Sequence, residues 1–387
     1  SEKIWDKINP RAVPSRALKI YRAAFQNYPT KGQKKKGEIK RREDIDRIKC
    51  AENFQKTSNL HGGRLQIYEL VKQVLNDNFD GISQKQYNDI MMKCFHGEQD
   101  SAEKYTNMLD NAIIMCDSSS SMEWSCSRVA PIFSAIGLSE IASQLTKPPF
   151  RNRILTFSSN PEWVILPETV YHTAEKGNIG ISGLDEKDWI DPTLNLVSGG
   201  FDTRVKMIAN ANWGGSTNLY KALQLILHNC IESRLTPSDV GKLVLFIFSD
   251  MQIDNSLEYG SSWDCEYNNI KKYFEEAGLK SSHNTPFPVP FIIFWNLNGN
   301  TVSNPVMGDQ EGAAYISGFS QSAFNGFMDG SLMKSKKIDS IKPSPYDIYR
   351  NTMDSERYQP IREICEEQNF EFTRLFENSQ DDLIFTS

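Results

Sequence analysis

The chain has 387 residues, which fits either two domains or one large α/β unit with a helical extension. A hydrophobic share of 39% with 11% aromatic residues is ample for a packed core and excludes a wholly disordered chain. The charge is uneven: residues 1–56 hold 16 Lys and Arg against 7 Asp and Glu, a net charge of +9, which leaves −15 for the rest of a chain whose total is −6. The sequence therefore indicates a basic arm joined to an acidic body.

The cysteines and the hydropathy of the chain indicate the kind of cellular compartment in which the protein works. The seven cysteines are an odd number, widely scattered, with no C-x-x-C pair and no zinc-ligand spacing. This favours a reducing compartment, and we expect a cytoplasmic location. The longest apolar runs, such as 243–248, are far shorter than the roughly 20 residues needed to cross a bilayer, so we expect no membrane partner.

Residues 1–110 are predicted to form a basic, mainly helical extension. Val13-Pro14-Ser15 offers a helix start, and apolar residues then follow at helical spacing. The run 31–42 is rich in Lys and Arg and lacks apolar periodicity, so we expect a loop that is mobile or ordered by a partner. Helical patterns resume at 45–54, 65–75 and 84–94.

From residue 111 to residue 387, short apolar strands alternate with helices. This rhythm predicts an α/β fold with a doubly wound, mostly parallel, Rossmann-like sheet covered on both faces. We expect strands at 112–116, 153–157, 163–166, 242–248, 290–295 and 314–316. We expect helices at 129–145, 203–209, 219–233, 266–277, 321–328 and 346–368, the last being a C-terminal helix.

Three short segments of this second part predict a metal site. The apolar strand 112–116 runs directly into Asp117-x-Ser119-x-Ser121, Thr217 precedes a helix, and Asp250 ends a buried strand. Ligands of parallel α/β sheets sit beyond the carboxyl ends of the strands, where these oxygens would converge. Each piece alone is a weak signal, because serine-rich turns after strands usually just cap the next helix, a threonine before a helix is a common N-cap, and an aspartate often closes a strand, whereas all three in this order favour a site.

The predicted ligands are hard oxygen donors that do not fill a coordination shell. Two carboxylates and three hydroxyls suit Mg²⁺, or Mn²⁺, with retained water better than zinc or a calcium cage. A site made mostly of neutral hydroxyls leaves positive charge on the ion, so a carboxylate from a protein partner is a natural further ligand. Binding, rather than reaction, is the expected use.

The same five residues resemble the metal-ion-dependent adhesion site (MIDAS) of the von Willebrand factor A (vWA) family. The resemblance implies a parallel sheet with one short antiparallel edge strand. It also implies that Asp117 and Asp250 act mostly through water, that Ser119 and Ser121 bind the ion directly, and that Thr217 joins when a ligand is engaged.

Further segments resemble a narrower group of proteins. The segments 212–218, 290–297 and 316–320 look like the A domain of an uncharacterised family that joins helical repeats to a C-terminal vWA domain. That family is similar in arrangement to the Ro (TROVE) proteins, which bind RNA through a ring of helical repeats. Residues 11–17 resemble the connector of such proteins, which implies a connector and A domain with little or no repeat ring.

An alternative function is therefore a Ro-like ribonucleoprotein component that binds RNA through the basic arm. Clustered cations release counterions from a phosphate backbone, although a charge run is more often a solvated loop, and no aromatic residues alternate with these cations. The candidate phosphate-binding residues are Lys34, Lys35, Lys36, Lys40, Arg41 and Arg42.

Enzymatic readings find less support, and we expect no catalysis. A strand that ends in Asp also begins the haloacid-dehalogenase phosphatases, but the acid/base position two residues on is Ser119, which cannot act as a general acid at neutral pH. No G-x-S-x-G motif occurs, and the five histidines lie far in sequence from the serine cluster.

Overall fold

The computed structural model describes residues 4–28, 43–58, 60–96, 108–117, 119–123, 129–191, 193–211, 218–251, 263–298 and 312–318. These belong to one unit that spans residues 1–325. The predicted helices 321–328 and 346–368 lie outside the described residues.

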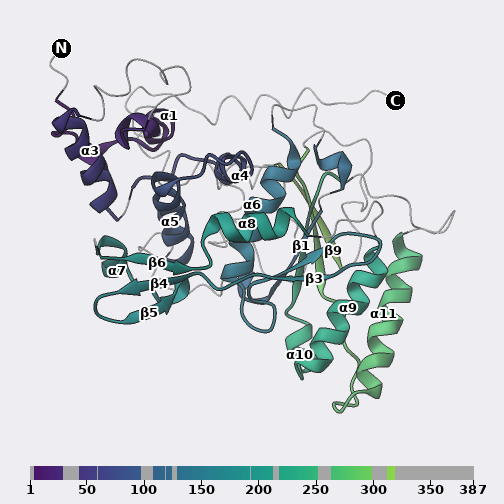
Figure 1. Ribbon diagram of the computed structural model, residues 1–387. Helices are drawn as coiled ribbons and strands as arrows, with labels where there is room; N and C mark the ends of the chain where they lie inside the picture. The colour runs from purple at the N-terminus through teal and green to yellow at the C-terminus, as the bar shows by residue number, and fades with distance from the viewer. Residues whose placement is uncertain are drawn as a thin grey trace, which may run out of the picture. The chain divides into compact units, whose positions relative to one another are not determined.

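A six-stranded sheet forms the centre of the described unit (Figure 1). All neighbouring strands run parallel except β3, which pairs antiparallel with β2 at one edge. This confirms the predicted mostly parallel α/β fold and the short antiparallel edge strand. In order across the sheet, the strands are β3 (Trp163–Ile165), β2 (Arg153–Thr156), β1 (Ala112–Cys116), β7 (Val244–Ser249), β8 (Phe291–Asn296) and β9 (Ala313–Ser317).

Helices cover both faces of this sheet, which explains why its central strands are apolar without alternation. Ile113 and Met115 of β1 face a hydrophobic cluster shared with three helices, while the opposite face of β1 contacts α6 (Pro131–Leu145). Figure 1 shows the three helices together on one side of the sheet. They are α9 (Leu219–Glu232), α10 (Pro237–Val240) and α11 (Trp263–Lys280).

The N-terminal part is helical, as predicted. Its elements are η1 (Pro10–Ala12), α1 (Ser15–Phe25), α3 (Ile45–Lys56), α4 (Ile67–Leu75) and α5 (Gly81–His96). Helix α4 packs on α6, and Gly137 permits the close approach, since a Cβ there would lie 2.8 Å from Cγ1 of Ile67. Helix α8 (Phe201–Ala209) packs against both α4 and α6.

A second, three-stranded antiparallel sheet was not predicted from the sequence. We expected no strand between residues 166 and 242, yet β4 pairs with β5 on one side and with β6 on the other. The reason is length: each strand has four residues, too few to show a period-2 pattern. This part contains β4 (Val170–Thr173), β5 (Gly177–Gly180), η4 (Ile181–Gly183), α7 (Glu186–Ile190) and β6 (Asn195–Ser198).

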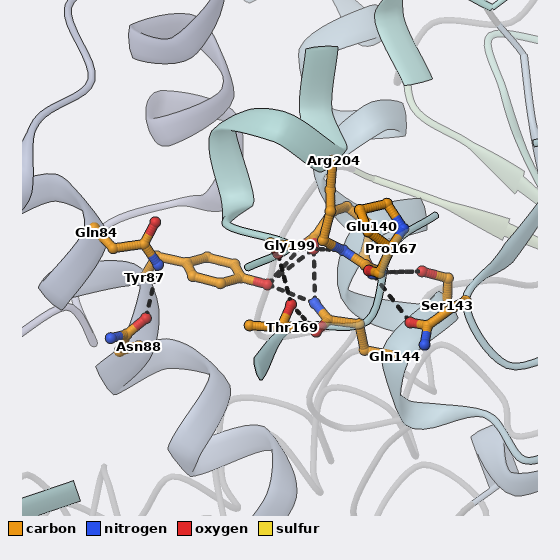
Figure 2. A network of polar contacts seen from close by, with 11 residues as sticks. Gln84, Tyr87, Asn88, Glu140, Ser143, Gln144, Pro167, Thr169, Gly199 and Arg204 are labelled. Atoms are coloured by element: carbon orange, nitrogen blue, oxygen red, sulfur yellow. Dashed lines mark hydrogen bonds and ion pairs between the residues drawn. The ribbon is translucent and has the colours of Figure 1, made fainter. Parts of the chain in front are cut away.

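A buried polar network joins the helical N-terminal part to the α/β part (Figure 2). Arg204 of α8 donates from Nε to Oε1 of Glu140 in α6 at 2.8 Å, and neither side chain is exposed. Tyr87 of α5 donates to Oε2 of Glu140 at 2.8 Å, and Nε2 of Gln144 donates to Oε1 at 2.6 Å. Thr169, just before β4, donates to Oε1 of Gln144 at 2.9 Å. Four elements are therefore fixed to one buried ion pair, which needs these extra hydrogen bonds to offset desolvation.

Candidate metal centre

The two acidic residues of the predicted site follow neighbouring parallel strands. Cys116, the last residue of β1, is in register with Phe248 of β7, and the backbone N–H of Asp117 donates to the carbonyl of Phe248 at 2.9 Å. Asp250 comes directly after Ser249, the last residue of β7. The strand ends therefore bring Asp117 and Asp250 to the same edge of the sheet, and each is only 1% exposed.

The carboxylate of Asp117 is held by two donors. The backbone N–H of Ser119 donates to Oδ1 at 2.9 Å, and the hydroxyl of Ser249 donates to Oδ2 at 2.6 Å. Because both carboxylate oxygens accept a hydrogen bond from a different part of the chain, the orientation of this side chain is fixed before any ligand arrives.

The two serines of the motif lie together beyond this carboxylate. Oγ of Ser119 is 2.9 Å from Oγ of Ser121, within hydrogen-bond distance. A short helix, η3 (Ser120–Glu123), follows, and its first turn is closed by the bond from the N–H of Met122 to the carbonyl of Ser119. This tight turn explains the x-Ser-x-Ser spacing: residues two apart present their hydroxyls to each other.

Burial and charge both act on Asp117. Burial raises the pKa of its carboxyl from 3.8 to about 6, and the negative charge of Asp250 adds to the rise. Hydrogen bonds from Ser249 and Ser119 work in the opposite direction and lower the pKa. A buried carboxyl beside a second carboxylate favours a bound cation, which would offset both desolvation and repulsion.

The third predicted segment approaches the same edge, although Thr217 itself lies outside the described residues. The N–H of Asn218, which caps α9, donates to the carbonyl of Ser158 just beyond β2 at 3.2 Å. Nζ of Lys221 donates to the carbonyl of Ser159 at 3.2 Å. Since β2 neighbours β1, the start of α9 is anchored at the carboxyl edge of the sheet.

The residues present fit a hard divalent cation. Asp117, Asp250, Ser119 and Ser121 offer oxygen donors alone, as Mg²⁺ and Mn²⁺ prefer. Within the described ranges there is no group of three or more His, Cys, Asp or Glu side chains that could hold a metal ion. A cation here would therefore depend on hydroxyls and water as well as on the two carboxylates.

One polar residue of the site was missed at the level of sequence. Ser249 is fully buried and contacts Asp117, although the two are 132 positions apart in the chain. Its only sequence signal is its place before Asp250 at the end of an apolar strand. The candidate phosphate-binding residues Lys34, Lys35, Lys36, Lys40, Arg41 and Arg42 lie outside the described residues.

Comparison with known proteins assigns a family. A profile described as a domain of unknown function, DUF7788, matches residues 111–178 and 190–367. The chain belongs to the DUF7788 family. The matched ranges include both acidic residues of the candidate centre and its two serines, Ser119 and Ser121. The candidate metal centre therefore lies in the DUF7788 part of the chain.

Individual relatives add little about activity. A curated relative of this DUF7788 protein is the uncharacterized protein L728 of Acanthamoeba polyphaga mimivirus, 29% identical over 319 residues. That match covers 82% of this chain and 46% of the relative, so the chain spans less than half of the relative's length. Among solved structures, the Ro (RSR) protein of Deinococcus radiodurans is similar over 82% of this chain and 59% of that chain, with 12% identity and a TM-score of 0.33. A similarity this low carries no argument about function.

No helix among the described residues is both long enough and apolar enough to span a membrane.

Proposed function

We propose that this DUF7788 protein is a binding module that uses Mg²⁺, or Mn²⁺, to recognise an acidic group of a protein partner. The observation that carries the proposal is the pair of buried carboxylates, Asp117 and Asp250, at the ends of adjacent strands, with the hydroxyls of Ser119 and Ser121 beside Asp117. Thr217 completes the proposed ligand set. The resemblance of these five positions to the MIDAS of vWA domains supports the same reading.

The donor chemistry favours binding over catalysis. Several of the proposed ligands are neutral hydroxyls, which do not neutralise a divalent ion. The ion therefore keeps a net positive charge and attracts a further carboxylate. Position 119 carries a hydroxyl where a phosphatase of the aspartyl-nucleophile type needs a second acid. We therefore propose no enzymatic step at this site.

Metal binding is tested by thermal unfolding of metal-stripped protein with and without Mg²⁺. Because a ligand that binds only the folded state stabilises it, Mg²⁺ at about 100 times its Kd should add about 2.7 kcal/mol to the free energy of unfolding. Asp117→Asn should abolish this gain. The matched control is Asp89→Asn, which alters a buried carboxylate in α5 that accepts from Gly62 and Lys93, and it should keep the gain. An unfolding curve of the wild type that ignores Mg²⁺ would overturn the proposal.

Partner recognition is tested by affinity capture with wild type and Asp117→Asn, each in Mg²⁺ and in EDTA. A protein retained only by the wild type in Mg²⁺ is the expected result, and replacing the acidic residues of that protein one by one should identify a single position that abolishes binding. A partner that tolerates every such replacement would contradict recognition of a carboxylate.

A role in a ribonucleoprotein is the second hypothesis, and RNA is the alternative partner. The observation that favours it is the basic run 31–42, with seven Lys and Arg and one Glu. The capture experiment separates the two, because RNA held by this run would be retained in EDTA and by Asp117→Asn. The cytoplasmic location stays a prediction from the cysteine pattern.

A further inference from the structure

The residue that links the two acidic groups of the candidate centre is Ser249. We propose that Ser249 is a positioning residue for the bound cation: its single hydroxyl orients the carboxylate of Asp117 and closes the turn that carries Asp250. This inference rests on the proposed metal site and concerns a residue outside the five-residue ligand pattern.

Toward β1, the hydroxyl acts as a donor. Oγ of Ser249 lies 2.6 Å from Oδ2 of Asp117, a short bond of the kind that a hydroxyl makes with an ionised acceptor. Since a serine has one hydroxyl proton, this contact uses it fully. Oδ1 of the same carboxylate already accepts from the N–H of Ser119, so the bond from Ser249 removes the remaining freedom to rotate.

Toward its own strand, the same hydroxyl acts as an acceptor. The N–H of Met251 donates to Oγ of Ser249 at 3.0 Å, so the side chain bridges the residue between them, Asp250. Met251 has a φ of 63°, in the left-handed region that residues other than glycine seldom adopt, and it is 2% exposed. The bond to Ser249 compensates for this unfavourable backbone conformation, which directs the chain after β7 and thereby fixes the position of Asp250.

The hydroxyl of Ser249 thus donates to Asp117 and accepts from Met251. Ser249 is fully buried, so water does not compete for either hydrogen bond. Two carboxylates at adjacent strand ends repel each other, and a flexible pair would separate in the absence of a cation. Replacing a residue that orients a metal ligand without touching the metal itself typically lowers the metal affinity about 10-fold to 100-fold. Ser249 has the contacts expected of such a residue.

The test is a Mn²⁺ titration in which free Mn²⁺ is followed by electron paramagnetic resonance, with Mg²⁺ competition. Ser249→Ala should weaken Mn²⁺ binding about 10-fold or more. Ser249→Thr retains the hydroxyl and should restore most of the affinity. Ser83→Ala is the matched control, since the hydroxyl of Ser83 in α5 is also buried but donates to Oε1 of Gln73 in α4 and not to Asp117. It should bind Mn²⁺ like the wild type.

Thermal unfolding in EDTA separates positioning from loss of fold. Ser249→Ala and Ser83→Ala should unfold at similar temperatures, because each removes one buried hydroxyl and its hydrogen bonds, to Asp117 and Met251 in the first case and to Gln73 and Asp80 in the second, while only the first variant loses affinity. If Ser249→Ala does not fold, Ser249→Cys replaces a strong donor by a weak one and should bind with reduced affinity. Unchanged affinity in Ser249→Ala, or in the Cys variant in its place, would overturn the positioning role alone, whereas a wild type that binds no Mn²⁺ would overturn the metal site and this inference together.

Discussion

Asp117 is the residue whose protonation decides how the candidate centre responds to pH. Its pKa is raised from 3.8 to about 6, so the folded protein binds this proton more tightly than the unfolded chain does. The resulting contribution to stability is fully present below pH 3.8 and is lost as the pH rises through 6. Above pH 6 the ionised, buried carboxylate destabilises the metal-free protein, and a bound divalent cation would offset this cost.

We therefore predict that the stabilisation by Mg²⁺ depends on pH. The increase in melting temperature on adding Mg²⁺ should be large at pH 7.5 and should shrink as the pH falls through 6, because protons then compete with the cation for Asp117. Thermal unfolding at a series of pH values measures this. In metal-free buffer, Asp117→Asn should lose the part of the pH dependence that lies between 3.8 and 6, and an Mg²⁺ effect that is equal at pH 5 and pH 7.5 would contradict the prediction.

At the scale of elements, the buried network around Glu140 fixes α5, α6, α8 and the segment before β4 to one another. Burial raises the pKa of the Glu140 carboxyl, and the Arg204 guanidinium opposes that rise. Arg204 also donates to the carbonyl of Pro167 and, at 3.0 Å, to Oγ of Ser143. Removal of the arginine would thus leave several acceptors without a donor in a space that excludes water.

We predict that Arg204→Met destabilises the protein by about 3–5 kcal/mol, the usual effect of leaving a buried charge without its partner. Adding Glu140→Leu to this variant should recover part of the loss, since the second change removes the orphaned carboxylate. Urea unfolding followed by circular dichroism gives both values. Additive losses in the double variant would show that Glu140 and Arg204 contribute independently.

The large elements could be predicted from sequence, whereas the small sheet and part of the site could not. The strand expected at 242–248 agrees with β7 to within two residues at each end, and its residues 243–248 have no polar alternation, as a strand covered on both faces requires. In contrast, β6 is exposed along its whole length and carries no hydrophobic pattern. Asp117 could be inferred because it directly follows a strand. The bond from Ser249 could not, because it depends on the register of Cys116 with Phe248 across two strands.

At the scale of the whole molecule, the family boundary at residue 111 cuts across buried contacts. Tyr87 donates to Glu140 from the N-terminal side of this boundary, and Ile67 covers Gly137 from the same side. We predict that a chain starting at residue 111 does not form a stable native state, because α6 would expose apolar surface and the Glu140–Arg204 ion pair would lose its cover and the hydrogen bonds from Tyr87. Near-ultraviolet circular dichroism tests this: a native spectrum and a cooperative melt of the shortened chain would contradict it.

Lysines of the basic arm and lysines of the acidic body are expected to contribute differently to RNA binding. If the run 31–42 binds phosphates, replacing Lys34, Lys35 and Lys36 together with Ala should weaken binding and reduce the slope of log affinity against log salt by about 2, since each contact with a single strand contributes about 0.7. Fluorescence anisotropy with a labelled single-stranded RNA at several salt concentrations measures the slope. The control replaces three exposed lysines of the body, Lys242, Lys272 and Lys280. Both triple variants change the net charge of the protein equally. An equal loss of slope in the control would therefore assign the effect to total charge. An unchanged slope in the Lys34, Lys35 and Lys36 variant would show that the run 31–42 does not bind RNA.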